Sequence, residues 1–280
     1  MTTESSPNNH RLRAARLTRI SAVEAQIQEE LDRIEKNDDV RILLAVESGS
    51  RAWGFASTDS DWDVRFVYVR RPEWYLSIRK RRDVLEYPIN EGLDVSGWDI
   101  TKALGLFAKS NPPLHEWLGS PIQYRESFST ARRLRDLSAQ FFSSRSCMHH
   151  YLHMAEGNFR EYLKGDTVRV KKYFYVLRPV LACRWIETHG RMPPTEFERL
   201  AKDRLPERLR PTLDALLERK RQGDELAVGP RIEELNDFLE SELERTRASS
   251  SAIPRGRGPD WDLLDQLFRE TLHEVWGRDR

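Results

Sequence analysis

Hydrophobic residues recur at regular intervals near the start of the chain and predict a helix followed by a strand. Between Leu17 and Glu35, apolar residues occupy every third or fourth position, which is the spacing of an amphipathic helix. The segment from Val40 to Glu47, VRILLAVE, is a short apolar run with β-branched residues that stops before Gly49-Ser50. It predicts a buried strand that enters a tight turn.

Three further segments have the composition of strands. They are residues 61–69 (DWDVRFVYV), 83–89 (DVLEYPI) and 93–100 (LDVSGWDI). Asn90-Glu91-Gly92 separates the last two and is typical of a hairpin turn. The pattern predicts a sheet of at least four strands that is partly antiparallel.

The second half of the chain predicts helices only, with no strand pattern from about Ser127 onward. The expected helices cover residues 128–142, 147–164, 168–188, 206–221, 230–247 and 260–276, with glycine- and proline-containing breaks between them. We therefore expect an α+β protein, with a mixed sheet flanked by helices in residues 1–125 and an all-helical domain in residues 126–280.

Charge and cysteine content limit the binding partners and the cellular compartment that we expect for the protein. Lys and Arg total 46 against 45 Asp and Glu, giving a net charge of +1, so any basic binding site must be local. The two cysteines, Cys147 and Cys183, are too few for a disulfide framework and favour a reducing, cytoplasmic environment. The polar start of the chain and the absence of a long apolar run predict neither a secretory signal nor a membrane span.

Candidate chemistry gathers around the turn and the second strand. Asp61 and Asp63 are two residues apart, so a strand would point both carboxylates to one face, where they could share a divalent cation such as Mg²⁺ or Mn²⁺. Gly49 and Ser50 can approach phosphate oxygens closely, and Arg51 adds a fixed positive charge. Each feature alone is common in surface turns, but together they indicate phosphoryl chemistry.

The combined pattern is specific: a strand, Gly-Ser, ten intervening residues, then Asp-x-Asp opening a second strand, with a further acid on a later strand. This arrangement resembles the signature of the DNA polymerase beta nucleotidyltransferase superfamily. Four blocks are similar to the prokaryotic, RNA-repair-associated branch of predicted nucleotidyltransferases: GSRAWGFASTDSDWDVRFVYVR (49–70), LDVSGWDITKAL (93–104), SNPPLHEWLGSPIQY (110–124) and VKKYFYVLRPVLACRW (170–185).

The resemblance implies a polymerase-beta-like palm domain that transfers a nucleoside monophosphate from a nucleoside triphosphate and releases pyrophosphate. It implies that Gly49 and Ser50 hold the triphosphate and that Asp61 and Asp63 hold the metals. A third acid would bind one metal and help to activate the attacking hydroxyl.

Two aspartates compete for the place of the third acid. Asp94 and Asp99 lie in the same predicted strand but on opposite faces, and Asp99 could instead cap the following helix. We favour Asp94. Asp59 lies two residues before Asp61, but in the loop, and we expect it to be a turn residue.

The helical half carries an asymmetric charge. The twenty residues between Asp166 and Glu187 contain five basic residues and no acid. Lys171, Lys172 and Arg178 are our candidates for contacts with triphosphate or with a nucleic-acid backbone, and in related nucleotidyltransferases a helical domain supplies such lysines. The alternative is that these bases form ion pairs with neighbouring helices. We expect the aromatic residues among them to belong to the core.

Two other features have simpler explanations. Cys147, His149, His150 and His153 suggest a metal site, but no matching second pair of ligands is evident, so we expect polar residues on a helix. Trp53 could stack on a base, although tryptophans in such positions are more often packing anchors.

The sequence leaves more than one possible acceptor for the nucleoside monophosphate. The resemblance favours an RNA end, whereas sibling branches that share the motif modify a protein side chain or a small molecule. A non-catalytic nucleotide- or RNA-binding module is the alternative from another class. The expected partners are therefore a nucleoside triphosphate with RNA or an acceptor protein, and no membrane.

Overall fold

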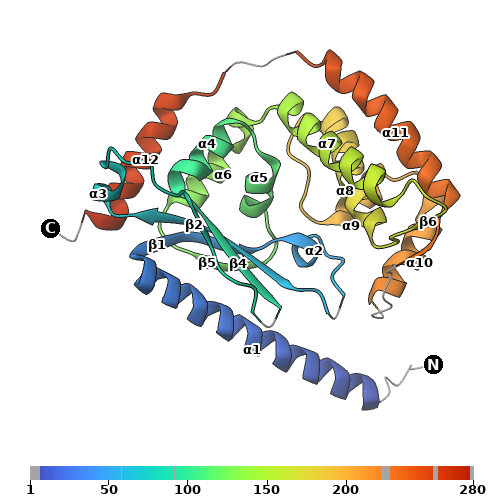
Figure 1. Ribbon diagram of the computed structural model, residues 1–280, viewed down its shortest axis with the longest axis horizontal. Helices are drawn as coiled ribbons and strands as arrows, with labels where there is room; N and C mark the ends of the chain where they lie inside the picture. The colour runs from blue at the N-terminus through green and yellow to red at the C-terminus, as the bar shows by residue number, and fades with distance from the viewer. Residues whose placement is uncertain (1–6, 58, 91, 222–227, 255–257, 278–280) are drawn as a thin grey trace, which may run out of the picture.

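The computed structural model describes residues 7–57, 59–90, 92–221, 228–254 and 258–277. The first half of the chain alternates helices and strands (Figure 1). Its elements are α1 (Pro7–Asp38), β1 (Val40–Glu47), α2 (Gly49–Ala52), β2 (Trp62–Arg70), α3 (Pro72–Tyr75), β3 (Val84–Glu86), β4 (Leu93–Asp99), α4 (Ile100–Ala108), α5 (Pro112–Leu118) and β5 (Gln123–Glu126).

Five of these strands form one mixed sheet in the order β3-β4-β2-β1-β5. β2 and β4 are parallel, and the other neighbouring pairs are antiparallel. The four strands predicted from the sequence are confirmed, and the antiparallel pairing of β3 with β4 confirms the hairpin. β5 is an additional strand that pairs with β1 along the far edge.

Helices cover both faces of this sheet. α1 lies beneath it in Figure 1 and packs Ile27, Leu31 and Ile34 against one face, as its helical periodicity predicts. α4 and α5 lie on the opposite face, where Val67 and Val69 of β2 meet their apolar side chains. Alternation along β2 therefore directs its odd-numbered residues toward α4 and α5 and its even-numbered residues toward α1.

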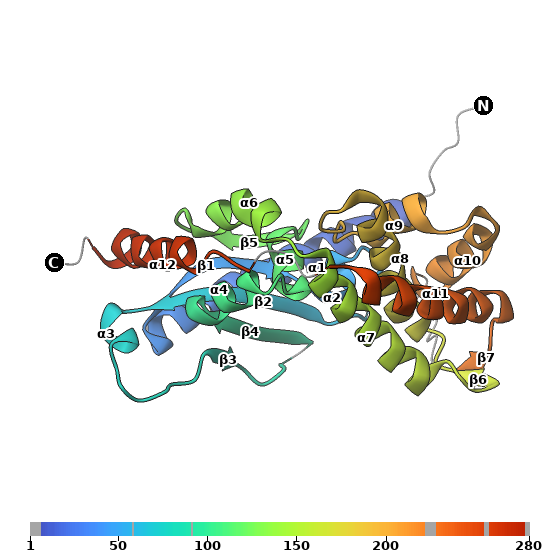
Figure 2. The same cartoon turned by 90° about the horizontal axis from the view of Figure 1, so that it is seen from above.

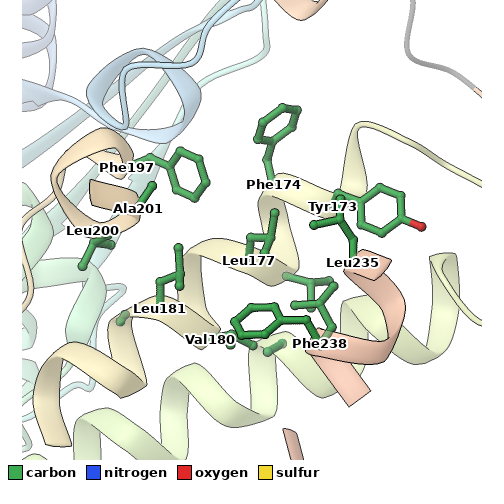
Figure 3. Close-up of a cluster of buried hydrophobic side chains, with 14 of the residues drawn as sticks. Tyr173, Phe174, Leu177, Val180, Leu181, Phe197, Leu200, Ala201, Leu235 and Phe238 are labelled. Carbon is green, nitrogen blue, oxygen red and sulfur yellow. The ribbon is translucent and has the colours of Figure 1, made fainter. Parts of the chain in front are cut away.

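The second half is mainly helical. It contains α6 (Thr130–Phe141), α7 (Ser144–Tyr162), α8 (Lys172–His189), α9 (Phe197–Arg204), a 3-10 turn (Glu207–Leu209), α10 (Arg210–Arg221), α11 (Glu233–Ala252) and α12 (Trp261–Trp276). α8 is the central helix, and Figure 3 shows its apolar side chains between those of α9 and α11. Tyr173, Phe174 and Leu177 are buried here, as predicted for the core.

The structure corrects the prediction of the second half in two places. A two-residue strand, β6 (Thr167–Val168), pairs with β7 (Gly229–Pro230), so strands do occur beyond residue 127 and α8 begins four residues later than predicted. The sequence prediction also omitted α9. Strands of two residues have too few positions to show a period, and α9 is barely two turns long.

The last helix returns to the first half of the molecule. Leu264 and Leu267 of α12 pack in the same apolar cluster as α4 and α5, together with Leu134 of α6. The division into domains at residue 125 stays a prediction, and the packing of these two helices links the proposed domains. In the described ranges, no helix combines the length and apolar composition that crossing a membrane requires.

Candidate active site

The turn after β1 brings the backbone against a carboxylate. Gly49 has φ of +59°, which favours glycine, and it opens the single turn α2 in which Ser50 is buried. The backbone N–H of Ser48 donates to the carbonyl of Asp63 over 2.8 Å, so the turn is joined to β2. A Cβ atom on residue 49 would lie 2.1 Å from Asp63 Oδ2. Only glycine leaves room for this carboxylate.

Two acids from parallel strands lie side by side at this point. Asp63 on β2 is the register partner of Asp94 on β4, so both side chains point to the sheet face that α4 and α5 cover further along. Arg65 lies between them, with its Nη2 atom 2.7 Å from Asp94 Oδ2 and 3.2 Å from Asp63 Oδ1. Its Nη1 atom also donates to the Asp94 carbonyl over 2.9 Å. Arg65 therefore fixes the relative position of the two carboxylates.

Asp61 adds a third negative charge to the same group. It is exposed and directly precedes β2, and its Oδ1 atom lies 3.4 Å from the position of a Cβ on Gly92, at the start of β4. Burial, followed by the charges of Asp94 and Asp61, raises the pKa of Asp63 against the opposing effect of Arg65. The charges of Asp94 and Asp61 therefore act on the carboxyl group of Asp63.

Asp99 has a different position. It is buried and is the N-cap of α4, where its Oδ1 atom accepts hydrogen bonds from the backbone N–H and the hydroxyl of Thr101. Its other oxygen accepts from the hydroxyl of Tyr75 over 2.9 Å. Of the two candidates for the third acid, Asp94 is the one that the structure brings beside Asp63.

Arg51 supports the loop that carries Asp61. Its guanidinium donates to the carbonyls of Asp61, over 3.0 Å, and Ser60, over 2.5 Å, and lies 3.9 Å from the ring centroid of Trp62. These contacts connect the two ends of the loop between α2 and β2. Contact of Arg51 with a nucleotide stays a prediction.

Glu47 is a residue of this site that the sequence analysis did not single out. It is fully buried at the end of β1, accepts the backbone N–H of Asp63 over 2.9 Å, and accepts a hydrogen bond from the hydroxyl of Tyr124. Burial raises its pKa to about 7. An acid at the end of an otherwise apolar strand was the available signal in the sequence.

The helical half approaches the acids through aromatic side chains. The rings of Trp53, in the loop after α2, and Tyr175, on α8, lie 5.7 Å apart. Burial and then the charges of Asp63 and Asp61 raise the pKa of Tyr175, so this part of α8 is within electrostatic reach of the acids. Trp53 also donates to Glu116 over 3.2 Å and packs against Phe55, which makes it a packing anchor.

Arg178 lies deeper than expected for a phosphate ligand. Its side chain is 1% exposed, and its Nη1 atom is 2.9 Å from Glu116 Oε1. It also donates to the carbonyl of Thr195 and stacks over Trp53. In this arrangement Arg178 joins α8 to α5 by a buried ion pair, which is the structural alternative considered for the basic segment.

Three lysines lie near this aromatic contact or influence one another by charge. Lys171 is exposed, whereas Lys172 stands over the rings of Tyr162 and Tyr175, with its Nζ atom 4.2 and 4.9 Å from their centroids. Lys220 of α10, which the sequence analysis missed, is 8% exposed and places Nζ 4.7 Å from the ring of Phe55 and 5.2 Å from that of Phe174. Burial and the charge of Lys171 lower the pKa of Lys220 to about 8. No carboxylate is paired with Lys220 in the part of the chain that the structure describes.

The aspartate group has the chemistry that a divalent cation requires. Its donors are hard carboxylate oxygens. Burial, and then repulsion from Asp94 and Asp61, raise the pKa of Asp63, and a bound cation would relieve that repulsion. Within the described ranges, no three acidic, histidine or cysteine side chains converge as a preformed metal site, and this holds for the histidines of α7 as well. The metal ligands therefore stay a prediction, with a donor set that fits Mg²⁺ or Mn²⁺.

Comparison with known proteins identifies a family and two similar proteins. Residues 23–270 match the model of a family described as the RNA repair pathway DNA polymerase beta family. The chain is 49% identical over 252 residues to the uncharacterized protein YcgL of Bacillus subtilis (strain 168), covering 90% of this chain and 97% of that protein. A crystal structure of a nucleotidyltransferase-like protein from Exiguobacterium sibiricum 255-15 is 12% identical with a TM-score of 0.36, covering 81% of this chain and 77% of that one. The family match spans most of the sequence, and the chain belongs to the RNA repair pathway DNA polymerase beta family.

Proposed function

We propose that this protein transfers a nucleoside monophosphate from a nucleoside triphosphate to a hydroxyl at an RNA end. The observation that carries the proposal is the pairing of Asp63 with Asp94 on one sheet face, directly against the Gly49 turn. A superfamily of nucleotidyltransferases uses such an acidic group beside a Gly-Ser turn. Family membership supports the reaction class, and the family's association with RNA repair supports the acceptor.

In the proposed reaction, the acceptor oxygen forms a bond to the α-phosphorus of the nucleotide while the bond to the bridging oxygen breaks and pyrophosphate leaves. Asp94 accepts the proton of the attacking hydroxyl, and Arg65 keeps Asp94 aligned with Asp63. Asp61, Asp63 and Asp94 would hold Mg²⁺ or Mn²⁺, which supplies Lewis acidity at the phosphate oxygens. The turn at Gly49 and Ser50 would face the triphosphate.

Lys220 supports a phosphate site on the helical side of the acids. A cation that is 8% exposed and has no paired carboxylate among the described residues is disfavoured in its charged form, and its pKa is lowered by burial and by the charge of Lys171. Residues that lower stability in this way are typical of functional sites. We assign Lys220, with Lys171 and Lys172, to the β- and γ-phosphates of the nucleotide.

The proposal is tested by label transfer from each of four α-labelled nucleoside triphosphates, with Mg²⁺ or Mn²⁺, to RNAs with defined ends and to a cell lysate. We expect transfer to RNA by the wild type and by Asp59→Asn, a matched control in the exposed loop, but none by Asp63→Asn. Label on a lysate protein would contradict the RNA acceptor. Nucleotide binding without pyrophosphate release in every condition would contradict catalysis and favour a binding module.

A further inference from the structure

The loop between α3 and β3 carries a concentrated positive charge. Residues 76–83, LSIRKRRD, contain four consecutive basic residues, and we call this segment the basic loop. Arg79, Lys80, Arg81 and Arg82 are all exposed, and Leu76 and Ile78 beside them are 82% and 107% exposed. In a chain whose net charge is +1, this segment is a local excess of positive charge.

Few of these charges have partners. Arg82 pairs with Glu86 across an exposed contact, and Asp83 lies 3.4 Å from Lys102. Arg79 and Lys80 have no ion pair with any described residue. Exposed ion pairs contribute little energy, so even Arg82 can exchange its partner for another anion.

The base of the loop is anchored on a tryptophan. Trp74 of α3 contacts two guanidinium groups, with Arg70 3.9 Å and Arg81 4.1 Å from its ring centroid. Arg70 is itself fixed by the carbonyl of Asp38, to which it donates over 2.6 Å. These contacts position Arg81 while the next residues on either side stay exposed.

The loop lies away from the acids, along the same strands. Figures 1 and 2 show α3 at the end of the sheet opposite to α2. Val84, two residues after Arg82, pairs with Trp98, whereas Asp94 lies at the beginning of β4. At about 3.3 Å per strand residue, Arg82 is roughly 20 Å from Asp94. This distance equals about six stacked nucleotides at 3.4 Å each.

We propose that the basic loop binds the phosphate backbone of the RNA acceptor, about six nucleotides from the end that reacts. The proposal rests on the function proposed above and names a second contact site for the same substrate. Unpaired exposed cations neutralise phosphates and release counterions, and the neighbouring Leu76 and Ile78 offer apolar contact to unstacked bases. An anionic membrane surface also attracts exposed cations beside apolar residues, but Trp74 is held between two arginines and does not face outward for insertion, so RNA is the favoured partner and vesicle binding is an outcome of the test.

The test compares the full-length wild type with Arg79→Gln/Lys80→Gln in binding fluorescent single-stranded RNAs of 4, 12 and 24 nucleotides across a salt series. Losing two phosphate contacts should reduce the slope of log affinity against log salt by about 1.4 and weaken binding of the 12-mer about tenfold at 0.1 M salt. The 4-mer should bind both proteins equally. Arg199→Gln/Lys202→Gln removes the same charge from exposed positions of α9 and should leave RNA binding unchanged.

Three results would overturn the proposal. They are failure of the wild type to bind the 12-mer, equal weakening by the two double variants, and loop-dependent binding to phosphatidylserine vesicles in place of RNA. Nucleotide binding, measured as a shift in melting temperature, should be the same in all three proteins. Loop-dependent RNA binding without any turnover would support this inference while contradicting the catalytic function, so the two can fail separately.

Discussion

Replacing Gly49 with alanine tests the contact between the turn and the acidic group. The new Cβ would lie 2.1 Å from Asp63 Oδ2, a separation that forces the carboxylate to move, and φ of +59° adds strain for any side chain. The backbone term is about 1 to 2 kcal/mol. Rotating Asp63 away from its present position and weakening its partly buried contact with Arg65 adds about 1 to 2 kcal/mol.

Gly190 supplies a matched control. It has φ of +60° at the end of α8, and nothing lies within 4 Å of the position of its Cβ. Gly190→Ala should therefore show the backbone term alone, about 1 to 2 kcal/mol, against about 2 to 4 kcal/mol for Gly49→Ala. Urea denaturation followed by tryptophan fluorescence measures both.

A double-mutant cycle isolates the clash. The Cβ of Asp63 is 3.5 Å from the position of a Cβ on residue 49, an ordinary contact, so Gly49→Ala in an Asp63→Ala background should destabilise no more than Gly190→Ala does. Pyrophosphate release by Gly49→Ala should fall about 100-fold, the effect of a displacement of about 1 Å at a reacting centre. Equal destabilisation by the two glycine substitutions, with full activity, would refute the reasoning.

Three further predictions follow from buried charges. Because burial raises the pKa of Glu47 to about 7, the folded state keeps a proton that the unfolded state loses near pH 4.5, and stability falls as pH rises from 4.5 to 7. Relative to wild type, Glu47→Gln should therefore be more stable at pH 8 than at pH 4 by about 3 kcal/mol. The same pH dependence of stability in wild type and variant, measured by urea denaturation, would contradict this prediction. Lys220→Met should raise stability at pH 7 by about 1 to 3 kcal/mol, because a pKa of about 8 means that the charged form of Lys220 is disfavoured in the folded protein. Its nucleotide affinity, measured by melting-temperature titration, should fall about tenfold. Unchanged affinity would exclude a phosphate contact. Arg178→Met should lower stability by about 3 kcal/mol, because it leaves Glu116 in the protein interior without its cation. Its nucleotide affinity should stay within about twofold of wild type. A large loss of affinity in a variant that still folds would instead indicate that Arg178 contacts the nucleotide directly.

The sequence pattern was enough to predict four strands of the five-stranded sheet and most of the helices. The strand that begins after Asp61 and the apolar strand before Gly49 both formed as predicted, because each is a short run of residues suited to a buried strand. What it did not provide was the register between strands. The parallel pairing that brings Asp94 beside Asp63 depends on contacts about thirty residues apart in sequence, which single-strand patterns do not encode.

Residues that act through distant contacts were missed for the same reason. Lys220 approaches Phe55 only because α10 folds back onto α8 and the loop after α2, and nothing adjacent to it in the sequence indicates this. The basic loop was visible as four consecutive basic residues, but its interpretation depended on their exposure and on the absence of an ion pair between Arg79 or Lys80 and any described residue. Conversely, Arg178 has the right charge and helical phase for a phosphate ligand, yet it is paired with a buried acid from α5.

The central claim is that Asp94, and not Asp99, completes the acidic group that transfers the nucleotide. The most direct measurement is pyrophosphate release from nucleoside triphosphates, with Mg²⁺ or Mn²⁺ and RNA present, for the wild type, Asp94→Asn and Asp99→Asn at equal folded fractions. We expect Asp94→Asn to lose at least about 100-fold in rate and Asp99→Asn to retain most of it, because asparagine also caps a helix. Full activity of Asp94→Asn would contradict the account.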